Sequence, residues 1–422
     1  MRVVILNTGT ELLLGNVVNA HLDFIAREIF ALGLRVEEQR TVPDGEGIRH
    51  ALTQLFLHCE ILFVTGGLGP TTDDITREIV AALLGLELQR DPNLLASLKR
   101  RLKMRGIKWT PNIGRQADVP AGAQVIPNDF GSAPGLYLKA NINGQIASPH
   151  IFVLPGPPRE LQPMFRNSVM PILRVIVPRT GSLGCQIYRI TGKGESLVEE
   201  AISDQLLAIP GLELGYCARP GDVDVRVVGE KSVLDEADAV ITSALDGFIY
   251  SRSGEDLEEV VVNLLARGKE TISVAESCTG GLLANRITNV PGASDVFVAG
   301  YVTYSNDAKT DILNVDGNVI EENGAVSEVV AHAMADGARK RADSTYALAT
   351  TGIAGPGGGS AEKPTGTVYI ALAAANSKTV VKKLFFPTDR ETFKQMTTQA
   401  ALDLLRRTLI RLETPAPSSP KN

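Results

Sequence analysis

The sequence lacks three features that would place it in common classes of protein. No apolar run approaches the roughly 18 residues that a membrane-spanning helix needs, so we expect no contact with a membrane. The four cysteines are scattered and form no CxxC pair, and the five histidines form no HxxxH pair. These absences argue against a structural zinc site and favour a reducing, cytoplasmic location.

The charge balance narrows the choice further. The chain carries 42 Lys and Arg residues against 48 Asp and Glu residues, a formal net charge of −6. We therefore expect small-molecule ligands and do not expect an extended nucleic-acid surface. With 422 residues, 44% of them hydrophobic, the chain is long enough to bury two or three cores.

Three regions of the chain differ in their patterns. Residues 1–171 alternate short apolar strands with amphipathic helices, which predicts a parallel sheet covered by helices on both faces. Residues 172–252 indicate a small α+β unit, and the α/β alternation returns over 253–414. The short segment 415–422, rich in Pro and Ser, is expected to be disordered. The predicted fold class is α/β: two α/β/α domains joined by the small α+β unit.

A glycine-rich turn follows a short strand of the first domain. It contains Gly66, Gly67 and Gly69, and backbone N–H groups in such a turn favour an anion such as a phosphate. Asp73 and Asp74 follow. A helix cap explains one of them, but two carboxylates beside a phosphate would repel it unless a cation bridges them. The turn therefore indicates either a metal–phosphate site or a tight turn with a capping aspartate.

Six motifs in this region resemble those of the N-terminal domain of the CinA family, itself similar to MoaB/MogA-like molybdopterin-binding proteins. They are GTELLLG (9–15), TVPD (41–44), GGLGPTTDDITRE (66–78), NIGRQADVPAGAQVIPN (112–128), GSAPG (131–135) and LPGPPREL (154–161). The resemblance implies a doubly wound, nucleotide-binding fold. It also implies an ADP-ribose pyrophosphatase activity that needs a divalent metal, for which Mg²⁺ is expected.

The same resemblance assigns residues to this site. Asp44 and Asp74 would hold the metal, with Asp73 as a third ligand, and the metal would neutralise the diphosphate and activate a water. Glu11 and Glu160 lie inside motifs and would orient substrate or water, although a surface carboxylate is the simpler explanation of each. One departure is Pro43, which stands where the family pattern more often has glycine.

The segment VAESCTGGLLANRIT (274–288) crowds two hydroxyls, a thiol and a carboxylate into the turn between a strand and a helix. A helix cap at Ser277 or Thr279 explains one hydroxyl but not the cluster. The two glycines that follow permit close approach of an anion. Lys309 is predicted in the first turn of a later helix, where the helix dipole disfavours its charge. It either points to water or serves as a base with a lowered pKa.

This segment and four others resemble the C-terminal CinA domain, known as the PncC-type nicotinamide-nucleotide amidohydrolase. The others are GYVTYSNDAKTDIL (300–313), GAVSE (324–328), ATTGIAGPGGG (349–359) and EKPTGTVYIAL (362–372). The resemblance implies deamidation of nicotinamide mononucleotide (NMN) to nicotinic acid mononucleotide and ammonia, without a cofactor. Ser277 would be the nucleophile and Lys309 the base. The other implied site residues are Thr351, Tyr304 and Ser294 as relays or oxyanion donors, and Thr279, Gly280, Gly281, Gly352, Gly355 and Arg390 as contacts to the nucleotide.

Three alternatives stay open. Cys278 is a rival nucleophile, because a helix N-terminus lowers a thiol pKa, although no histidine lies near it in sequence. The N-terminal domain could instead bind a molybdopterin or transfer a nucleotide. The whole chain could also be a non-catalytic regulator of competence or recombination. The expected partners are NMN and ADP-ribose, and the family resemblance implies a homodimer.

Overall fold

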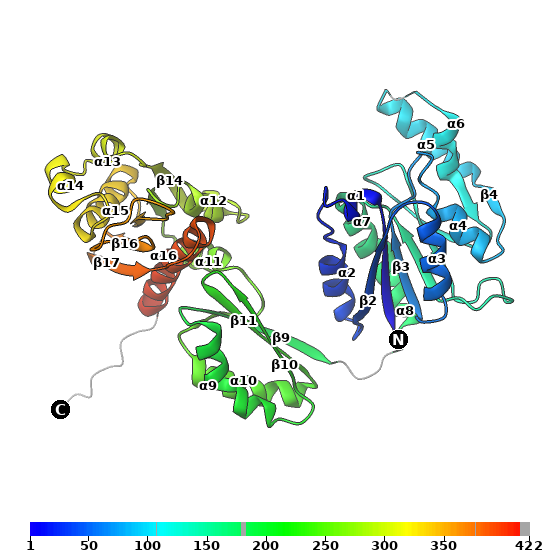
Figure 1. Ribbon diagram of the computed structural model, residues 1–422, viewed down its shortest axis with the longest axis horizontal. Helices are drawn as coiled ribbons and strands as arrows, with labels where there is room; N and C mark the ends of the chain where they lie inside the picture. The colour runs from blue at the N-terminus through cyan, green and yellow to red at the C-terminus, as the bar shows by residue number, and fades with distance from the viewer. Residues whose placement is uncertain (107, 179–182, 376, 414–422) are drawn as a thin grey trace. The chain divides into compact units, whose positions relative to one another are not determined.

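The computed structural model describes residues 1–106, 108–178, 183–375 and 377–413 (Figure 1). The chain divides into two compact units, Met1–Ser182 and Leu183–Asn422, and the predicted middle region belongs to the second. The segment 415–422, predicted to be disordered, lies outside the described residues. None of the helices in the described part combines the length and the apolar character that crossing a bilayer requires.

The first unit is built on a six-stranded sheet with the order β2-β1-β3-β8-β7-β6. Four strands are parallel, as predicted, but β6 and β7 are antiparallel to their neighbours, so the wholly parallel sheet is wrong at this edge. The connections on either side of β7 are too short for a parallel crossover, which needs about a dozen residues or more. The strands are β1 (Val3–Thr8), β2 (Val36–Val42), β3 (Ile61–Thr65), β6 (Gln124–Ile126), β7 (Gly135–Leu138) and β8 (His150–Leu154).

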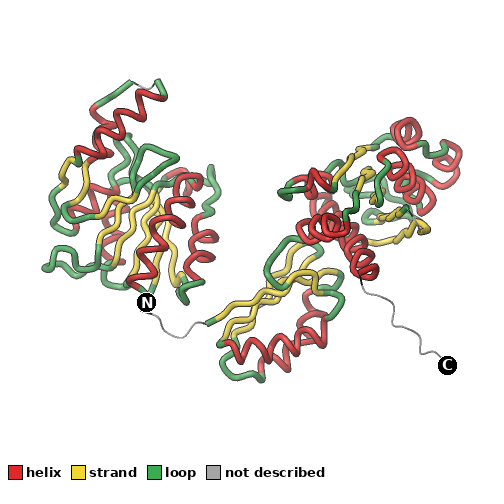
Figure 2. The backbone as a smooth tube through the Cα atoms, turned by 180° about the vertical axis from the view of Figure 1, so that it is seen from behind, coloured by secondary structure: helices red, strands yellow, loops and turns green. Residues whose placement is uncertain are grey.

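Helices cover both faces of this sheet (Figures 1 and 2). Val3 and Ile5 pack with α2, α7 and α8, while Val4 and Leu6 pack with α3 and α4 on the other face. Burial on both faces is what makes β1 a continuous apolar run. The helices and the small additional elements are α1 (Thr10–Leu13), α2 (His21–Phe30), α3 (Glu46–Leu55), α4 (Thr76–Leu83), β4 (Leu88–Arg90), α5 (Pro92–Met104), α6 (Pro111–Gly114), β5 (Asp118–Pro120), α7 (Pro158–Met164) and α8 (Met170–Ile176).

The second unit begins with a four-stranded antiparallel sheet in the order β10-β11-β9-β12. Helices α9 and α10 pack on it through Ile202 and Ile241, against Tyr188 and Val225 of the sheet. The sequence pattern missed β10, because its residues are half-buried or exposed. The elements are β9 (Gly184–Thr191), α9 (Glu195–Leu207), β10 (Glu213–Arg219), β11 (Asp222–Gly229), α10 (Lys231–Leu245) and β12 (Ile249–Ser251).

The rest of the second unit is a three-layer domain on a mixed sheet with the order β14-β13-β15-β16-β17. The first three strands are parallel and the last two antiparallel. Helices α11, α12 and α16 cover one face, and α13, α14 and α15 cover the other. The elements are α11 (Leu257–Gly268), β13 (Ile272–Glu276), α12 (Leu282–Thr288), β14 (Phe297–Val302), α13 (Asn306–Leu313), α14 (Gly317–Asn323), α15 (Glu328–Ala342), β15 (Tyr346–Gly352), β16 (Thr367–Ala374), β17 (Ser377–Phe385) and α16 (Arg390–Glu413).

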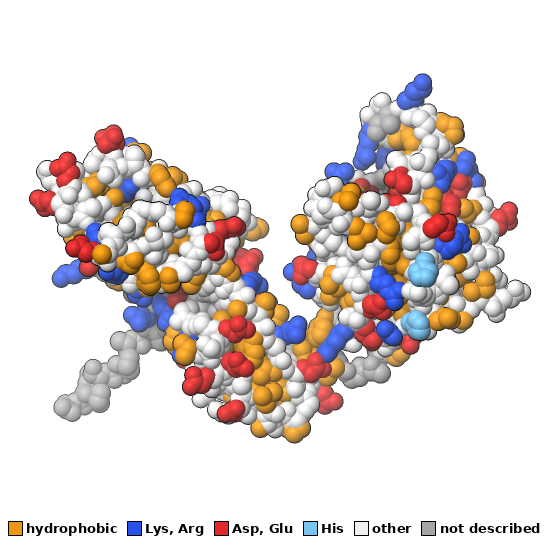
Figure 3. Space-filling view, in the orientation of Figure 1, with side chains coloured by type: hydrophobic (Ala, Val, Ile, Leu, Met, Phe, Trp, Pro, Cys, Tyr) orange, Lys and Arg blue, Asp and Glu red, His pale blue; other side chains and the backbone are white. Residues whose placement is uncertain are grey.

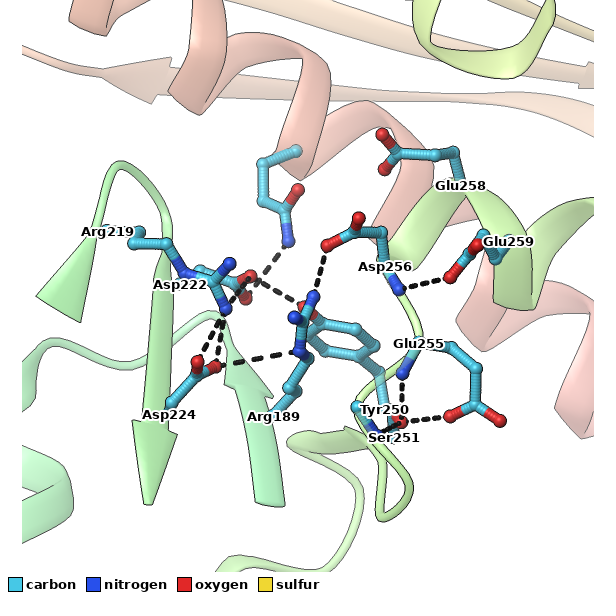
Figure 4. A network of polar contacts seen from close by, with 12 residues as sticks. Arg189, Arg219, Asp222, Asp224, Tyr250, Ser251, Glu255, Asp256, Glu258 and Glu259 are labelled. Carbon is cyan, nitrogen blue, oxygen red and sulfur yellow. Dashed lines mark hydrogen bonds and ion pairs between the residues drawn. The ribbon is translucent and has the colours of Figure 1, made fainter. Parts of the chain in front are cut away.

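Polar contacts join the small sheet to this domain (Figure 4). Arg189 on β9 donates to Asp256, the N-cap of α11. Asp222 on β11 accepts hydrogen bonds from Tyr250 Oη at 2.6 Å and from Gln399 Nε2 of α16 at 3.1 Å. Because these partners come from β9, β11, α11 and α16, the seam holds the small sheet and the domain together as one unit.

Candidate functional sites

The first candidate site is a pocket of about 360 Å³ at the carboxyl ends of the parallel strands of the first unit. Gly9 follows β1, Asp44 follows β2, Gly66 follows β3 and Gly156 follows β8, and all four line the pocket. Ligands bind in this crevice of open α/β sheets. The remaining sequence-predicted residues of this site also line it: Glu11, Gly67, Gly69, Asp73, Asp74 and Glu160.

Threonines hold the two principal aspartates of this pocket in place. Asp44 Oδ2 accepts hydrogen bonds from the backbone N of Thr10 at 3.0 Å and from its hydroxyl at 3.1 Å. Asp74 Oδ2 accepts from the backbone N of Thr71 at 2.9 Å and also from its hydroxyl. A hydrogen bond from Thr71 also lowers the pKa of exposed Asp73, so that carboxylate is charged at neutral pH. In both Asp44 and Asp74, a single threonine thus holds one carboxylate oxygen, Oδ2.

The glycine turn is sterically required at Gly67. Its φ of 66° is left-handed, and a Cβ there would overlap the Thr76 side chain at the start of α4. The turn can therefore bring its backbone close to α4 only with glycine at this position. Gly67 itself lines the pocket.

The donors in this pocket fit a divalent cation only in part. In the described ranges, no three His, Cys, Asp or Glu side chains are close enough together to form a metal site by themselves. Asp44 and Asp74 supply carboxylate oxygens, which Mg²⁺ prefers, and Mg²⁺ usually keeps several waters and substrate oxygens as its other ligands. Asp44 and Asp74 are therefore the pocket residues that would serve as protein donors to such a cation.

The second candidate site lies at the carboxyl end of β13, where Ser277 follows the strand. Lys309 Nζ lies 3.1 Å from Ser277 Oγ and 2.8 Å from the carbonyl oxygen of Thr303. The carbonyls of Tyr304 and Ser305 lie at 3.2 and 3.4 Å from the same nitrogen. Lys309 is only 1% exposed, and this burial lowers its pKa. The structure thus brings together the predicted nucleophile and base.

Cys278, the rival nucleophile, is in a different environment from Ser277. Its side chain is buried in the core that α11, α12 and α16 form on the sheet. Burial raises the pKa of its thiol to about 12, the reverse of the shift expected at a helix N-terminus. A thiol in this state is protonated near neutral pH, so the environment favours Ser277 as nucleophile.

The turn after Ser277 is held by Glu276, which is fully buried. Its carboxylate accepts hydrogen bonds from the Thr279 hydroxyl at 2.6 Å and from the backbone N of Gly281 at 3.0 Å, and it also accepts from Leu283 and Ala284. The N–H of Gly280 donates to the Ser277 carbonyl. The Thr279 hydroxyl and the N–H groups of Gly280 and Gly281 already make hydrogen bonds within the turn. Contrary to prediction, these three groups are therefore not free to bind a nucleotide phosphate.

Arg390, at the start of α16, connects two predicted parts of this site. Its guanidinium donates to the Tyr304 hydroxyl at 2.9 Å and to the carbonyl of Gly355 in the glycine-rich loop, also at 2.9 Å. Tyr304 is 59% exposed, so the pair lies at the rim of the site. Thr351 lies on the neighbouring strand β15, which ends at Gly352, and its hydroxyl donates to the carbonyl of Ala325 at 2.8 Å.

Ser294 lies away from the other predicted residues. It precedes the first residue of β14, whereas Ser277 follows the last residue of β13, and the two strands are parallel. The two serines are therefore at opposite ends of the sheet. The predicted role of Ser294 as a relay to Ser277 is wrong within a single copy of the chain.

Comparisons with known proteins follow this division of the molecule. The family profile described as "Probable molybdopterin binding domain" matches residues 4–175, and that described as "CinA C-terminal domain" matches residues 254–409. A "CinA-like protein" from Akkermansia muciniphila is 43% identical over 406 residues, which cover 95% of this chain and 96% of that protein. The chain belongs to the CinA family.

Two further similarities were found. A "CinA-like protein" from Geotalea uraniireducens is 40% identical over 420 residues, covering 98% of each chain. The crystal structure of the competence/damage inducible protein CihA from Agrobacterium tumefaciens is 40% identical and covers 38% of this chain and 98% of that chain, with a TM-score of 0.36.

Four polar residues of this CinA-family chain were missed by the sequence analysis. Gln116 lines the first pocket, and its Nε2 donates to the Leu68 carbonyl at 3.3 Å. Asn128 Nδ2 donates to Glu160 at 2.8 Å. In the second site the missed residues are Glu276 and Thr350, whose hydroxyl lies 2.7 Å from that of Thr279. All four lie inside quoted motifs. Their spacing in the sequence is not distinctive, so it did not mark them as site residues.

Proposed function

We propose that the C-terminal domain hydrolyses the carboxamide of nicotinamide mononucleotide, releasing ammonia and nicotinic acid mononucleotide. The observation that carries this proposal is the 3.1 Å approach of Lys309 Nζ to Ser277 Oγ in a buried site. A serine needs a base to become a nucleophile, and a lysine acts as that base only when it is neutral. The lowered pKa of Lys309 supports this role.

The reaction then proceeds in two steps. Ser277 Oγ attacks the carboxamide carbon while its proton moves to Lys309, and Lys309 passes that proton to the departing nitrogen, which leaves as ammonia. A water attacks the resulting ester and loses a proton to Lys309, and Lys309 returns that proton to the departing Ser277 Oγ as the carboxylate product is released. The Thr303 and Tyr304 carbonyls accept the two N–H bonds of the neutral amine, so its lone pair can face the serine hydroxyl.

Two backbone groups are available for the oxyanion. Ser277 N donates to the Thr350 carbonyl at 3.0 Å, so it is already used. In the part of the chain that the structure describes, the N–H groups of Cys278 and Thr279 donate no backbone or side-chain hydrogen bond at these distances. We assign them as the donors to the developing negative charge, where a preorganised donor contributes most.

The experiment that tests this proposal is direct. The purified full chain is incubated with NMN and ammonia is assayed, with nicotinic acid mononucleotide identified by mass spectrometry. We expect equal amounts of both products, with Ser277→Ala as the inactive control. Release of free nicotinamide without ammonia would show that a different bond is cut and would overturn the proposal.

For the N-terminal domain we propose hydrolysis of the diphosphate of ADP-ribose. The pocket that joins the glycine turn to Asp44 and Asp74 supports a phosphate ligand accompanied by a cation. A bound Mg²⁺ would neutralise the diphosphate and lower the pKa of a water. Among the chain's own residues, Asp44 and Asp74 would hold the cation, and the turn would hold the phosphates through its backbone.

The family profile also keeps open a pterin-binding function for this domain. The two functions are separated by incubating the chain with ADP-ribose and Mg²⁺ and analysing the nucleotides. Hydrolysis yields AMP and ribose 5-phosphate, and EDTA should stop it. Unchanged ADP-ribose, together with saturable binding of a pterin phosphate, would favour the binding module.

A further inference from the structure

A separate cavity of about 680 Å³ lies in the second unit, between the small antiparallel sheet and helix α16. Its volume is in the range of small-molecule sites, roughly 300–1,000 Å³. Neither Ser277 nor Lys309 lines it, so it is distinct from the deamidation site. Its walls come from the loop between β9 and α9, the β10–β11 turn, β17 and α16.

Two cations converge on one aromatic ring in this cavity. Lys193 Nζ lies 4.5 Å from the centroid of the Phe248 ring, and Arg407 Cζ lies 5.1 Å from the same centroid. Lys193 has no carboxylate within ion-pair distance among the residues described. Arg407 is paired with Asp403, so Lys193 is the cation on this ring that lacks a counter-charge. An anion bound beside Lys193 would supply one.

The buried acidic side chains of the cavity are already engaged. Asp403 accepts from Arg406 Nε at 2.9 Å and from Arg407 Nε at 2.6 Å. Asp222 accepts from Tyr250 and Gln399, as Figure 4 shows for the labelled pair. Glu195 also lines the cavity but is exposed in the first turn of α9. The lining of the cavity carries four cations, Lys193, Arg219, Lys382 and Arg407, against the three carboxylates Glu195, Asp222 and Asp403, so one positive charge remains uncompensated.

The backbone beside Lys193 adds donors for an anion. Gly192, Lys193 and Gly194 line the cavity immediately before α9, a helix of 13 residues. Among the residues described, no side chain caps this helix, and the N–H groups of Leu197 and Val198 donate to the Gly194 carbonyl. The N–H groups of Glu195 and Ser196 therefore remain available to a ligand. A Cβ at Gly192 would lie 3.3 Å from Arg407 Nη2, which places the guanidinium next to this loop.

The rest of the cavity is apolar. Phe248, Phe386 and Leu384 line it, together with Met396 of α16 and Val223 of β11. Such walls suit a flat organic ring rather than a free inorganic ion. Charge at one end and apolar surface at the other match a small molecule that carries a phosphate and a ring.

We propose that this cavity binds a nucleoside monophosphate. The phosphate would lie against Lys193 and the N-terminus of α9, and the base would lie against the apolar wall that includes Phe386 and Met396. The site is independent of both proposed hydrolytic reactions, because it shares no residue with either.

Methionine methyl NMR tests this on the full chain. The sequence has six methionines, and of these Met396 lines the cavity. Selective ¹³C-methyl labelling therefore gives a signal that reports the cavity itself, assigned with Met396→Leu. We expect AMP to shift the Met396 signal saturably and inorganic phosphate to compete with it, whereas adenosine should need at least about tenfold higher concentration because it lacks the charge-assisted contacts.

A pair of lysine variants supplies the control. Lys193→Gln should raise the AMP concentration at half-saturation by about tenfold or more. Lys231→Gln, which removes an exposed lysine of α10 outside the cavity, should leave it unchanged. Both variants must first show the wild-type methyl spectrum. A Met396 signal that AMP does not move at millimolar concentration, equal shifts with adenosine, or equal effects of the two lysine variants would overturn the proposal.

Discussion

The two candidate hydrolytic sites occupy the same place in two different sheets. Each lies at the carboxyl ends of parallel strands, beside a turn that contains two adjacent glycines. In the first, the carboxylates of Asp44 and Asp74 are half-buried and line an open pocket. In the second, Lys309 is 1% exposed and burial lowers its pKa. The first arrangement offers carboxylates to a ligand, and the second lowers the pKa of a buried lysine.

This difference indicates how similar sheet ends can support different chemistry. The first site, with its carboxylates Asp44 and Asp74, needs a cation from solution to accept an anionic diphosphate. A site that neutralises a lysine needs no cation, but its activity depends on pH. A chelator should therefore act on the first site alone, and acid should act most strongly on the second.

The strongest test of the second site is removal of its nucleophile. Ser277→Ala should lower the NMN deamidation rate by at least about 10⁴-fold, because nucleophile deletions in serine hydrolases have effects of this size or larger. Cys278→Ala should retain most of the rate, since its thiol is buried and protonated. Saturating NMN and an ammonia assay measure both. An active Ser277→Ala beside an inactive Cys278→Ala would exchange the two assignments.

Removal of the base should have the next largest effect. Lys309→Met should lower deamidation by about 10²–10⁴-fold. Catalysis needs the neutral amine, so the wild-type rate should fall as pH drops through the pKa of Lys309, which burial places below the usual 10.5. This limb of the pH profile at limiting NMN should vanish in Lys309→Met. Lys309→Arg, which cannot deprotonate, should not restore the rate, and an active arginine variant would show that only positive charge is needed.

The first site should respond to loss of a carboxylate with a smaller change. Asp44→Asn and Asp74→Asn should each lower ADP-ribose hydrolysis by about 100-fold, partly recovered by higher Mg²⁺, because each removes one charged metal ligand. Asp23→Asn, an exposed acid on α2, is the matched control. Deamidation by all three variants should equal that of the wild type. Full ADP-ribose hydrolysis in EDTA would exclude the metal.

The glycine turns should differ in their tolerance of a methyl group. Gly67→Ala should destabilise the first unit by about 3 kcal/mol, since it combines a left-handed φ with overlap on Thr76. Gly281→Ala should cost the second unit only about 1–2 kcal/mol, because its Cβ would lie 3.6 Å from Val302 and only the φ of 94° is unfavourable. Calorimetry of the full chain measures both. Equal losses of stability in the two variants would show that the structure relaxes to remove the overlap between a Cβ at Gly67 and Thr76.

Strand and helix periodicity predicted most of the fold. The α/β alternation of the first and last regions corresponds to two sheets that are covered by helices on both faces. The antiparallel edge of the first sheet was not predictable from periodicity, because strand direction depends on connection length. Strand β10 was missed because a half-buried strand lacks clear alternation.

For the sites, the sequence showed which residues follow a strand directly. It did not show which residues far apart in the chain come close together in space. The turn sequences correctly indicated which residues would follow strands, and the Ser277–Lys309 approach joins residues 32 positions apart. Ser294 was misplaced because a serine near the site in sequence can lie at the other end of a strand. The hydrogen bonds of Glu276 could not be foreseen, since they depend on how tightly the turn closes over α12.

Helix α16 has a consequence for the order of events during synthesis. Phe393, Leu402 and Leu405 are fully buried in the core against α11 and the sheet, and Gln399 bonds to the small sheet. The domain cannot close its core until these last residues have been made. The first unit needs nothing beyond residue 182. At about 5–20 residues per second, it has roughly 10–50 s to fold before α16 emerges. Protease protection of ribosome-bound chains arrested near residue 380 should therefore show a resistant first unit and a sensitive second unit, and a resistant second unit would contradict this order.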